Sequence, residues 1–145
     1  MNRADQEEVS CFDPARGIEM KLRVRYFETD QMGFVHHAHY LVWFESARSE
    51  FCRIKGIAYS EMERNGLALP IIEAQCRYMK PARYDDDLIV RAWVTERHHS
   101  LLRMRYEVLR NLDLLSAGWT LQALIQLSSG AVRRFPPEIA ALFDS

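Results

Sequence analysis

The sequence lacks long hydrophobic runs, an excess of charge of one sign and an apolar leader segment. Typical apolar stretches, such as residues 40–44 and 67–72, are far shorter than the roughly 20 residues that a membrane-spanning helix needs. The 19 basic and 20 acidic side chains give a formal net charge of -1, which is no argument for nucleic-acid binding. The polar, acidic segment 1–17 does not resemble a signal peptide. We therefore expect neither a membrane span nor a nucleic-acid partner.

Cysteine is also scarce: Cys11, Cys52 and Cys76 are the three examples, and no Cys-x-x-Cys spacing occurs. An odd number of cysteines is typical of free thiols in a reducing, cytoplasmic setting, and it argues against a disulfide framework or a zinc site. Cys52 falls in a predicted helix and Cys76 in a predicted strand. A small buried hydrophobic side chain is the favoured interpretation of both, and a catalytic thiol is the alternative.

The remaining composition suits one globular domain, because the chain has 145 residues, of which 48% are hydrophobic and 27% charged. We expect residues 1–17 to form a poorly ordered tail and residues 18–145 to fold. The first predicted strand covers residues 21–26, where apolar side chains alternate with basic ones.

The strongest helical pattern begins at Tyr40 and ends near Lys55, where Gly56 suits a C-terminal cap. A short second helix is predicted over residues 59–65, with Ser60 as its N-cap. Spacings of four, three, four and three residues place the apolar positions of the long helix on one face. These positions are Tyr40, Phe44, Ala47, Phe51 and Ile54.

The rest of the chain predicts strands joined by short loops, which makes neighbouring strands antiparallel. These strands cover residues 69–78, 88–96, 101–110 and about 117–127, and a short helical turn follows Pro137. The expected fold class is α+β, with a five-stranded antiparallel sheet wrapped around one long helix. Because such a sheet has an open edge, we expect a homodimer or a dimer of dimers.

A candidate site lies where residues 29–33 lead into the long helix. Residues 36–39 include no Ser, Thr, Asp or Asn to cap it, so the backbone N–H groups near His37 and Ala38 are predicted to be free for a ligand. The helix dipole adds positive potential there, which suits a developing oxyanion with Asp30 beside it as base or nucleophile. In the alternative interpretation, Asp30 only caps a turn and the glycine after it only provides a positive φ.

The residues around this site follow the pattern Tyr-x-x-Thr-Asp-x-x-Gly-x-Val-x-His-x-x-Tyr-x-x-Phe-x-x-Ala-Arg. The matching positions, with the phenylalanine one place displaced, are Tyr26, Thr29, Asp30, Gly33, Val35, His37, Tyr40, Phe44, Ala47 and Arg48. The pattern resembles the 4-hydroxybenzoyl-CoA thioesterase family of hotdog-fold acyl-CoA thioesterases, particularly the branch associated with the bacterial Tol–Pal gene cluster. Residues 77–86 are similar to the family's second strand and following loop, so the resemblance runs from Lys21 to about Pro137.

The resemblance implies a hotdog fold in which a curved sheet wraps the helix, two subunits join edge to edge, and the active sites lie between them. It implies that Asp30 is the catalytic carboxylate and that the backbone N–H of His37 polarises the thioester carbonyl of an acyl-CoA. Direct attack by the acid and activation of water both stay open, and no cofactor is implied. The implied substrate-binding residues are Gly33, Val35, His36 and Tyr40.

Two positions depart from the family pattern. An aromatic residue is usual where His36 stands, and Asn or Ser is usual where His39 stands. These departures bear on the acyl group and leave the acid and the glycine intact. A histidine-bound metal is the alternative, but His36, His37 and His39 form no carboxylate–histidine pair at helical spacing, so we expect no metal.

A second group of polar residues is a candidate site for the coenzyme A phosphates, since arginine pairs well with phosphate. Its members are Arg97, His98, His99, Ser100, Arg133 and Arg134. The alternative is that these side chains are solvated loop residues.

Hydrolysis of an acyl-CoA to a free acid and coenzyme A is the favoured function. An enoyl-thioester hydratase is one alternative, and it is expected to carry an Asp/His pair in a different motif before the helix. A non-catalytic acyl-CoA-binding module is the other alternative, and the presence of Asp30 argues against it.

Overall fold

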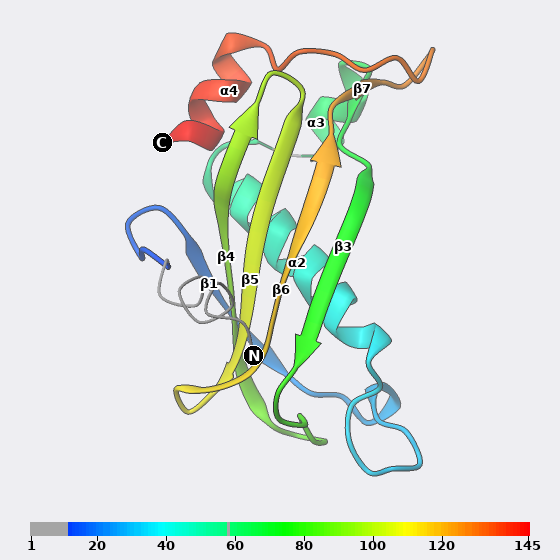
Figure 1. Cartoon of the computed structure of the whole chain (residues 1–145), viewed down its shortest axis with the longest axis vertical. Helices are drawn as coiled ribbons and strands as arrows, with labels where there is room; N and C mark the ends of the chain where they lie inside the picture. The colour runs from blue at the N-terminus through cyan, green and yellow to red at the C-terminus, as the bar shows by residue number, and fades with distance from the viewer. Residues whose placement is uncertain (1–11, 58) are drawn as a thin grey trace.

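The structure is a computed structural model that describes residues 12–57 and 59–145 (Figure 1). One strand of the main sheet, β1, comes before the helices around the candidate site, and the other four strands of that sheet follow them. The elements are β1 (Ile18–Arg23), the 3-10 helix η2 (Tyr26–Glu28), α2 (Ala38–Ile54), α3 (Tyr59–Arg64), β2 (Leu67–Ala68), β3 (Ile71–Tyr78), β4 (Asp87–His98), β5 (Leu101–Arg110), β6 (Asp113–Ala123), β7 (Ile125–Gln126) and α4 (Pro137–Asp144).

Five strands form one antiparallel sheet in the order β1-β4-β5-β6-β3, so β1 and β3 are its edges. Figure 1 shows α2 lying across one face of this sheet, with the start of the helix near one end of the strands and α4 near the other. The short strands β2 and β7 pair separately. This arrangement confirms the predicted α+β class and the five-stranded sheet around one long helix.

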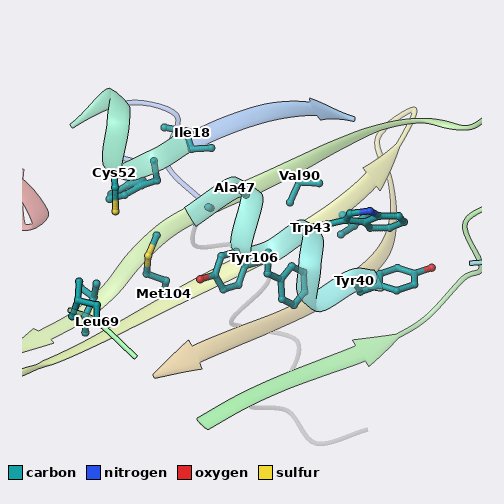
Figure 2. Packing of buried hydrophobic residues seen from close by; sticks show 14 of the residues in the cluster. Ile18, Tyr40, Trp43, Ala47, Cys52, Leu69, Val90, Met104 and Tyr106 are labelled. Carbon is teal, nitrogen blue, oxygen red and sulfur yellow. The ribbon is translucent and has the colours of Figure 1, made fainter. Parts of the chain in front are cut away.

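The apolar face of α2 forms the centre of the core, as the helical spacing predicts. Tyr40 and Trp43 are at most 2% exposed and lie in the buried cluster (Figure 2). Phe44 is fully buried, and its ring stacks on that of Tyr106 with 4.5 Å between centroids. The prediction is wrong for Ile54, which is 59% exposed because it is the last residue of the helix. Cys52 is fully buried, as expected for a small hydrophobic side chain.

The C-terminus of α2 carries the predicted glycine cap. Gly56 has φ of +85°, its N–H donates to the carbonyl of Arg53, and the N–H of Ile57 donates to the carbonyl of Cys52. These two bonds satisfy carbonyls that the helix leaves unpaired, which is the Schellman arrangement. The predicted N-cap of the next helix is wrong, because Ser60 lies inside α3.

Some strand boundaries differ from the sequence prediction because local contacts override the alternating pattern. β1 ends at Arg23, and Tyr26 is 77% exposed in η2 instead of sharing a buried strand face. The predicted strand at 69–78 begins two residues later, at Ile71 after Pro70, as β3, and the separate short strand β2 precedes it. The predicted strand at 117–127 begins earlier, at Asp113, and divides into β6 and β7. The C-terminal turn is the eight-residue helix α4.

Residues 12–17, from the segment predicted as a tail, form a turn beside the sheet. The N–H of Gly17 donates to the carbonyl of Asp13, and the ring of Phe12 lies 5.3 Å from that of Trp93. The rest of the predicted tail, including Cys11, lies outside the described residues. Within residues 12–57 and 59–145, every helix is too short or too polar to cross a membrane.

Gly118 allows α2 to approach the sheet closely, and this contact yields a stability prediction. A Cβ at Gly118 would lie 2.2 Å from the carbonyl oxygen of Gln75 and 2.7 Å from Cε2 of Phe44. We expect Gly118→Ala to lower the free energy of unfolding by about 3 kcal/mol in urea denaturation, because the backbone of β3 cannot yield easily.

The matched control is Gly130→Ala, where an added Cβ has no neighbour within 4 Å and only the φ of +72° opposes it. Its expected loss is about 1 kcal/mol. Equal stability of the two variants would contradict the close packing of Phe44 between the strands.

Candidate active site

Asp30 lies in a tight turn between η2 and α2. Its N–H donates to the carbonyl of Phe34 at 3.1 Å, and its carbonyl accepts the N–H of Gly33 at 3.0 Å. Gly33 has φ of +87°, a conformation that favours glycine. The Oδ1 atom of Asp30 accepts the N–H of Met32 at 2.9 Å, whereas Oδ2 has no hydrogen-bond partner among the described residues. Asp30 therefore holds the turn with one oxygen and keeps the other available.

The backbone N–H of His37, at the start of α2, has no hydrogen-bond acceptor among the described residues. His37 is the N-cap residue, with φ of -55°, and its side chain makes no capping hydrogen bond. Contrary to the sequence prediction, the N–H of Ala38 is not free, because it donates to Nδ1 of His36 at 3.1 Å. The N–H of His39 donates to the carbonyl of His36. In the described part of the chain, nothing accepts a hydrogen bond from the N–H of His37.

A pocket of about 540 Å³ opens beside this turn and the helix start. It brings together five residues predicted from the sequence, namely Asp30, Val35, His36, His37 and Tyr40. Gly33 shapes the turn and does not line the pocket. Tyr78, Met79 and Lys80 at the end of β3 also line it, and they were not predicted as site residues.

Tyr78 ties the end of β3 to the first turn of α2. Its hydroxyl donates to the carbonyl of His37 at 2.8 Å, and its ring lies 5.0 Å from that of Tyr40. Burial and the contact with Cys76 raise the pKa of Tyr78, so the hydroxyl stays protonated and can donate. Because strand periodicity says nothing about hydroxyl partners, the sequence offers no signal for this contact.

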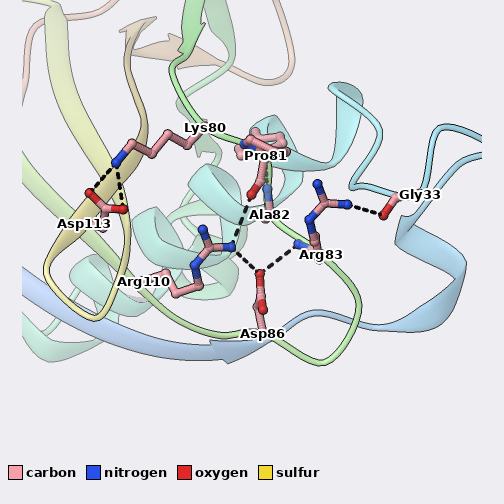
Figure 3. Close-up of polar contacts among 9 residues, drawn as sticks. Gly33, Lys80, Pro81, Ala82, Arg83, Asp86, Arg110 and Asp113 are labelled. Carbon is pink, nitrogen blue, oxygen red and sulfur yellow. Dashed lines mark hydrogen bonds and ion pairs between the residues drawn. The ribbon is translucent and has the colours of Figure 1, made fainter.

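The loop that follows β3 folds onto the turn that carries Asp30. The N–H of Val35 donates to the carbonyl of Ala82 at 2.8 Å, and Nη1 of Arg83 donates to the carbonyl of Gly33 at 3.3 Å. Figure 3 shows that Oδ2 of Asp86 accepts both the N–H of Arg83, at 2.8 Å, and Nη1 of Arg110, at 2.7 Å. The charged loop predicted at residues 80–87 is thus a support for the site.

The residues predicted to meet the coenzyme A phosphates lie away from this pocket within one chain. The β4–β5 turn and the segment before α4 are near one end of the sheet, and the start of α2 is near the other (Figure 1). Arg97 and His98 belong to β4, and only His99 and Ser100 form the turn. Arg97 makes two hydrogen bonds to Asp144, of 2.6 and 2.7 Å, which attach α4 to the sheet.

The other basic members differ in their contacts. Nη1 of Arg133 donates to Oε1 of Gln126, and the carbonyl of His99 accepts the N–H of Phe135 next to Arg134. His98 lies 3.9 Å from Glu96, which is too long for a hydrogen bond. Phosphate binding by this group stays a prediction.

The three neighbouring histidines are close but point to different partners. The rings of His36 and His37 are 4.1 Å apart between centroids, and that of His39 lies 5.9 Å from the ring of Phe27. Nδ1 of His36 is already occupied by the helix N–H. Across residues 12–57 and 59–145, no group of three His, Cys, Asp or Glu side chains is placed to hold a metal ion.

An antiparallel sheet over one long helix, with a carboxylate at the helix start, defines a hotdog-fold protein. The family described as the Thioesterase superfamily matches residues 32–117. The chain is 31% identical over 128 residues to the acyl-CoA thioesterase YbgC of Haemophilus influenzae, covering 88% of this chain and 94% of that protein. It is 41% identical over 76 residues to YneP of Bacillus subtilis, covering 52% of this chain and 55% of that protein.

A solved thioesterase structure is also similar to this chain. The DHNA-CoA thioesterase of Staphylococcus aureus superimposes with a TM-score of 0.85 at 26% identity, over 88% of this chain and 89% of that one. The chain therefore belongs to the thioesterase superfamily, and these similarities support thioester hydrolysis as its reaction.

The two ion pairs of Figure 3 differ in exposure, and this difference yields a prediction. The Asp86 and Arg110 side chains are 22% and 29% exposed, whereas those of Asp113 and Lys80 are 49% and 53% exposed. We expect Asp86→Asn to lower the free energy of unfolding by about 2 kcal/mol, because Oδ2 accepts two hydrogen bonds. Asp113→Asn should cost less than about 1 kcal/mol. Chemical denaturation measures both, and equal losses would show that the loop does not depend on Asp86.

Proposed function

We propose that this protein hydrolyses acyl-CoA thioesters, with Asp30 as the catalytic carboxylate and the backbone N–H of His37 as the oxyanion donor. The observation that carries the proposal is their shared pocket, in which neither Oδ2 of Asp30 nor the N–H of His37 has a hydrogen-bond partner among residues 12–57 and 59–145. The name of the YbgC relative, an acyl-CoA thioesterase, supports coenzyme A as the carrier of the acyl group.

The proposed reaction needs few groups because a thioester has an activated carbonyl and a good leaving group. The carbonyl oxygen accepts the N–H of His37, and the dipole of the 17-residue helix α2 stabilises the negative charge that develops there. Asp30 either takes a proton from the attacking water or attacks the carbonyl itself. Positioned acid–base groups contribute about 10²- to 10⁴-fold, and one oxyanion donor contributes about 10²- to 10³-fold.

Two alternatives remain weaker than hydrolysis. The relatives and structural neighbours named as thioesterases favour hydrolysis over hydration of an enoyl thioester. Asp30 lines the pocket, and its Oδ2 has no hydrogen-bond partner in the part of the chain that the structure describes, which favours a reactive site over a module that only binds acyl-CoA. The proposed mechanism uses no cofactor.

Assembly is part of the proposal. The exposed fractions of Ile71 and Ile72 on edge strand β3 are 40% and 53%. Such an apolar edge suits pairing with the same strand of a second subunit. Antiparallel pairing of identical edges would bring the partner's far end beside this pocket. In such a homodimer, or a dimer of dimers, residues 97–100 and 133–134 of one subunit are the proposed contacts for the phosphates of the other. The odd number of cysteines, three in the whole sequence, supports a reducing, cytoplasmic setting.

The role of Asp30 is tested by Asp30→Asn. The amide is nearly isosteric and can still accept the N–H of Met32, so the turn should survive, but it can neither attack a thioester nor take a proton. We expect kcat to fall by at least about 10²-fold while the Kd for a non-hydrolysable acyl-CoA analogue stays unchanged. Thiol release and calorimetry measure the two quantities. Asp113→Asn is the charge-matched control on the surface, and a fully active Asp30→Asn variant would overturn the mechanism.

The role of the His37 backbone is tested separately from that of its imidazole. Proline removes the N–H and is compatible with the φ of -55° at the start of a helix. We expect His37→Pro to lose about 10²- to 10³-fold in kcat and His37→Ala, which keeps the N–H, to retain most activity. Circular dichroism checks that both variants fold. If alanine proves as damaging as proline, the imidazole and not the backbone donor is the group that matters.

A further inference from the structure

Glu28 is an acidic residue that the protein encloses completely. Its exposed fraction is 0%, and both carboxylate oxygens accept hydrogen bonds. Oε1 accepts the backbone N–H of Arg25 at 2.8 Å, and Oε2 accepts Nε1–H of Trp43 at 2.7 Å. The guanidinium Nε of Arg25 lies 3.6 Å from Oε1. Glu28 therefore joins the segment before the Asp30 turn to the body of α2.

The backbone of Glu28 closes the same turn from its other side. Its carbonyl accepts the N–H of His36 at 2.9 Å, and its own N–H donates to the carbonyl of Arg25 at 3.1 Å. Asp30 follows two residues later, and His37 follows His36 directly. Glu28 thus links the loop that carries Asp30 to the segment that enters α2. Through Trp43 it also contacts α2 itself, the helix whose N-terminus presents the N–H of His37.

A carboxylate is the side chain that fits this position. Burying an acid is costly unless both oxygens have donors, and Glu28 has a donor for each. An apolar residue would leave the N–H of Arg25 and Nε1–H of Trp43 without acceptors. Glutamine would satisfy one donor and turn its NH₂ toward the other. The contact is therefore specific for an acid, although Glu28 does not line the pocket.

We propose that Glu28 is a positioning residue for catalysis, which sets the placement of the Asp30 carboxylate relative to the backbone N–H of His37. This inference rests on the proposed function. Small displacements of reacting groups cost a large part of the rate, so a loosened Glu28 contact reduces turnover even where Asp30 is intact. Binding of coenzyme A does not depend on that placement, so the effect falls on kcat.

The test compares Glu28→Gln with a control that removes another buried hydrogen-bonding group. We expect Glu28→Gln to lower kcat by about 10- to 100-fold and to leave the Kd for a non-hydrolysable acyl-CoA analogue unchanged. The control is Tyr106→Phe, which deletes a hydroxyl bonded to Nη1 of Arg48 at 3.1 Å and to Thr120 at 2.7 Å. It should lower the melting temperature without lowering kcat.

Trp43→Phe keeps an aromatic ring in the core and removes the donor to Oε2 together with part of the buried indole. It carries the test if Glu28→Gln does not fold, with circular dichroism to show that the variant itself is folded. It should also lower kcat. Because both substitutions act on one hydrogen bond, the double variant should lose less than the product of the two single losses. Normal kcat in folded Glu28→Gln or Trp43→Phe, alongside an inactive Asp30→Asn, would overturn the role of Glu28 alone. An active Asp30→Asn would instead overturn the proposed function.

Discussion

The contact between Phe44 and the sheet is the constraint on which the rest of the structure depends. The Phe44 ring lies nearly parallel to that of Tyr106, at an angle of 8°, and it fits because Gly118 on the neighbouring strand has no side chain. An α-helix is stiff and rises 1.5 Å per residue. Fixing Phe44 therefore also fixes His37, two turns earlier, at one end of the sheet. The place of the site follows from this contact between helix and strands.

The candidate site consists of the start of α2 and of loops that pack beside it. The Asp30 turn is held by the backbone bond from Val35 to Ala82 and by Arg83 at the carbonyl of Gly33. Glu28 also holds it, because its carbonyl accepts the N–H of His36. Functional loops supported by a rigid scaffold are common, because loops alone have little stability. Here the support comes from polar contacts between segments that are far apart in the sequence. The geometry of the reacting groups consequently depends on residues that never touch the substrate.

Periodicity predicted the elements whose side chains alternate between core and solvent. The strand at residues 101–110 matches β5 at both ends, and the apolar stripe from Tyr40 to Phe51 faces the sheet. Prediction failed where one polar contact outweighs the pattern. Tyr26 alternates correctly for a strand, but Glu28 accepts the N–H of Arg25 and turns the chain into η2. No local rule in the sequence shows that Trp43 is available as the second donor.

The candidate site was predictable to the extent that a motif encodes it. Asp30 and His37 could be placed from the pattern before the helix, whereas Tyr78 and the loop after β3 depend on contacts across the fold. The motif includes residues that support the fold as well as residues of the candidate site. Arg48 is an example of the first kind, because it is 8% exposed and its Nη1 donates to the hydroxyl of Tyr106. The second half of the motif therefore seats the helix, and the first half supplies the acid. A chain that retains Phe44 and Arg48 can keep this fold without the chemistry proposed for Asp30.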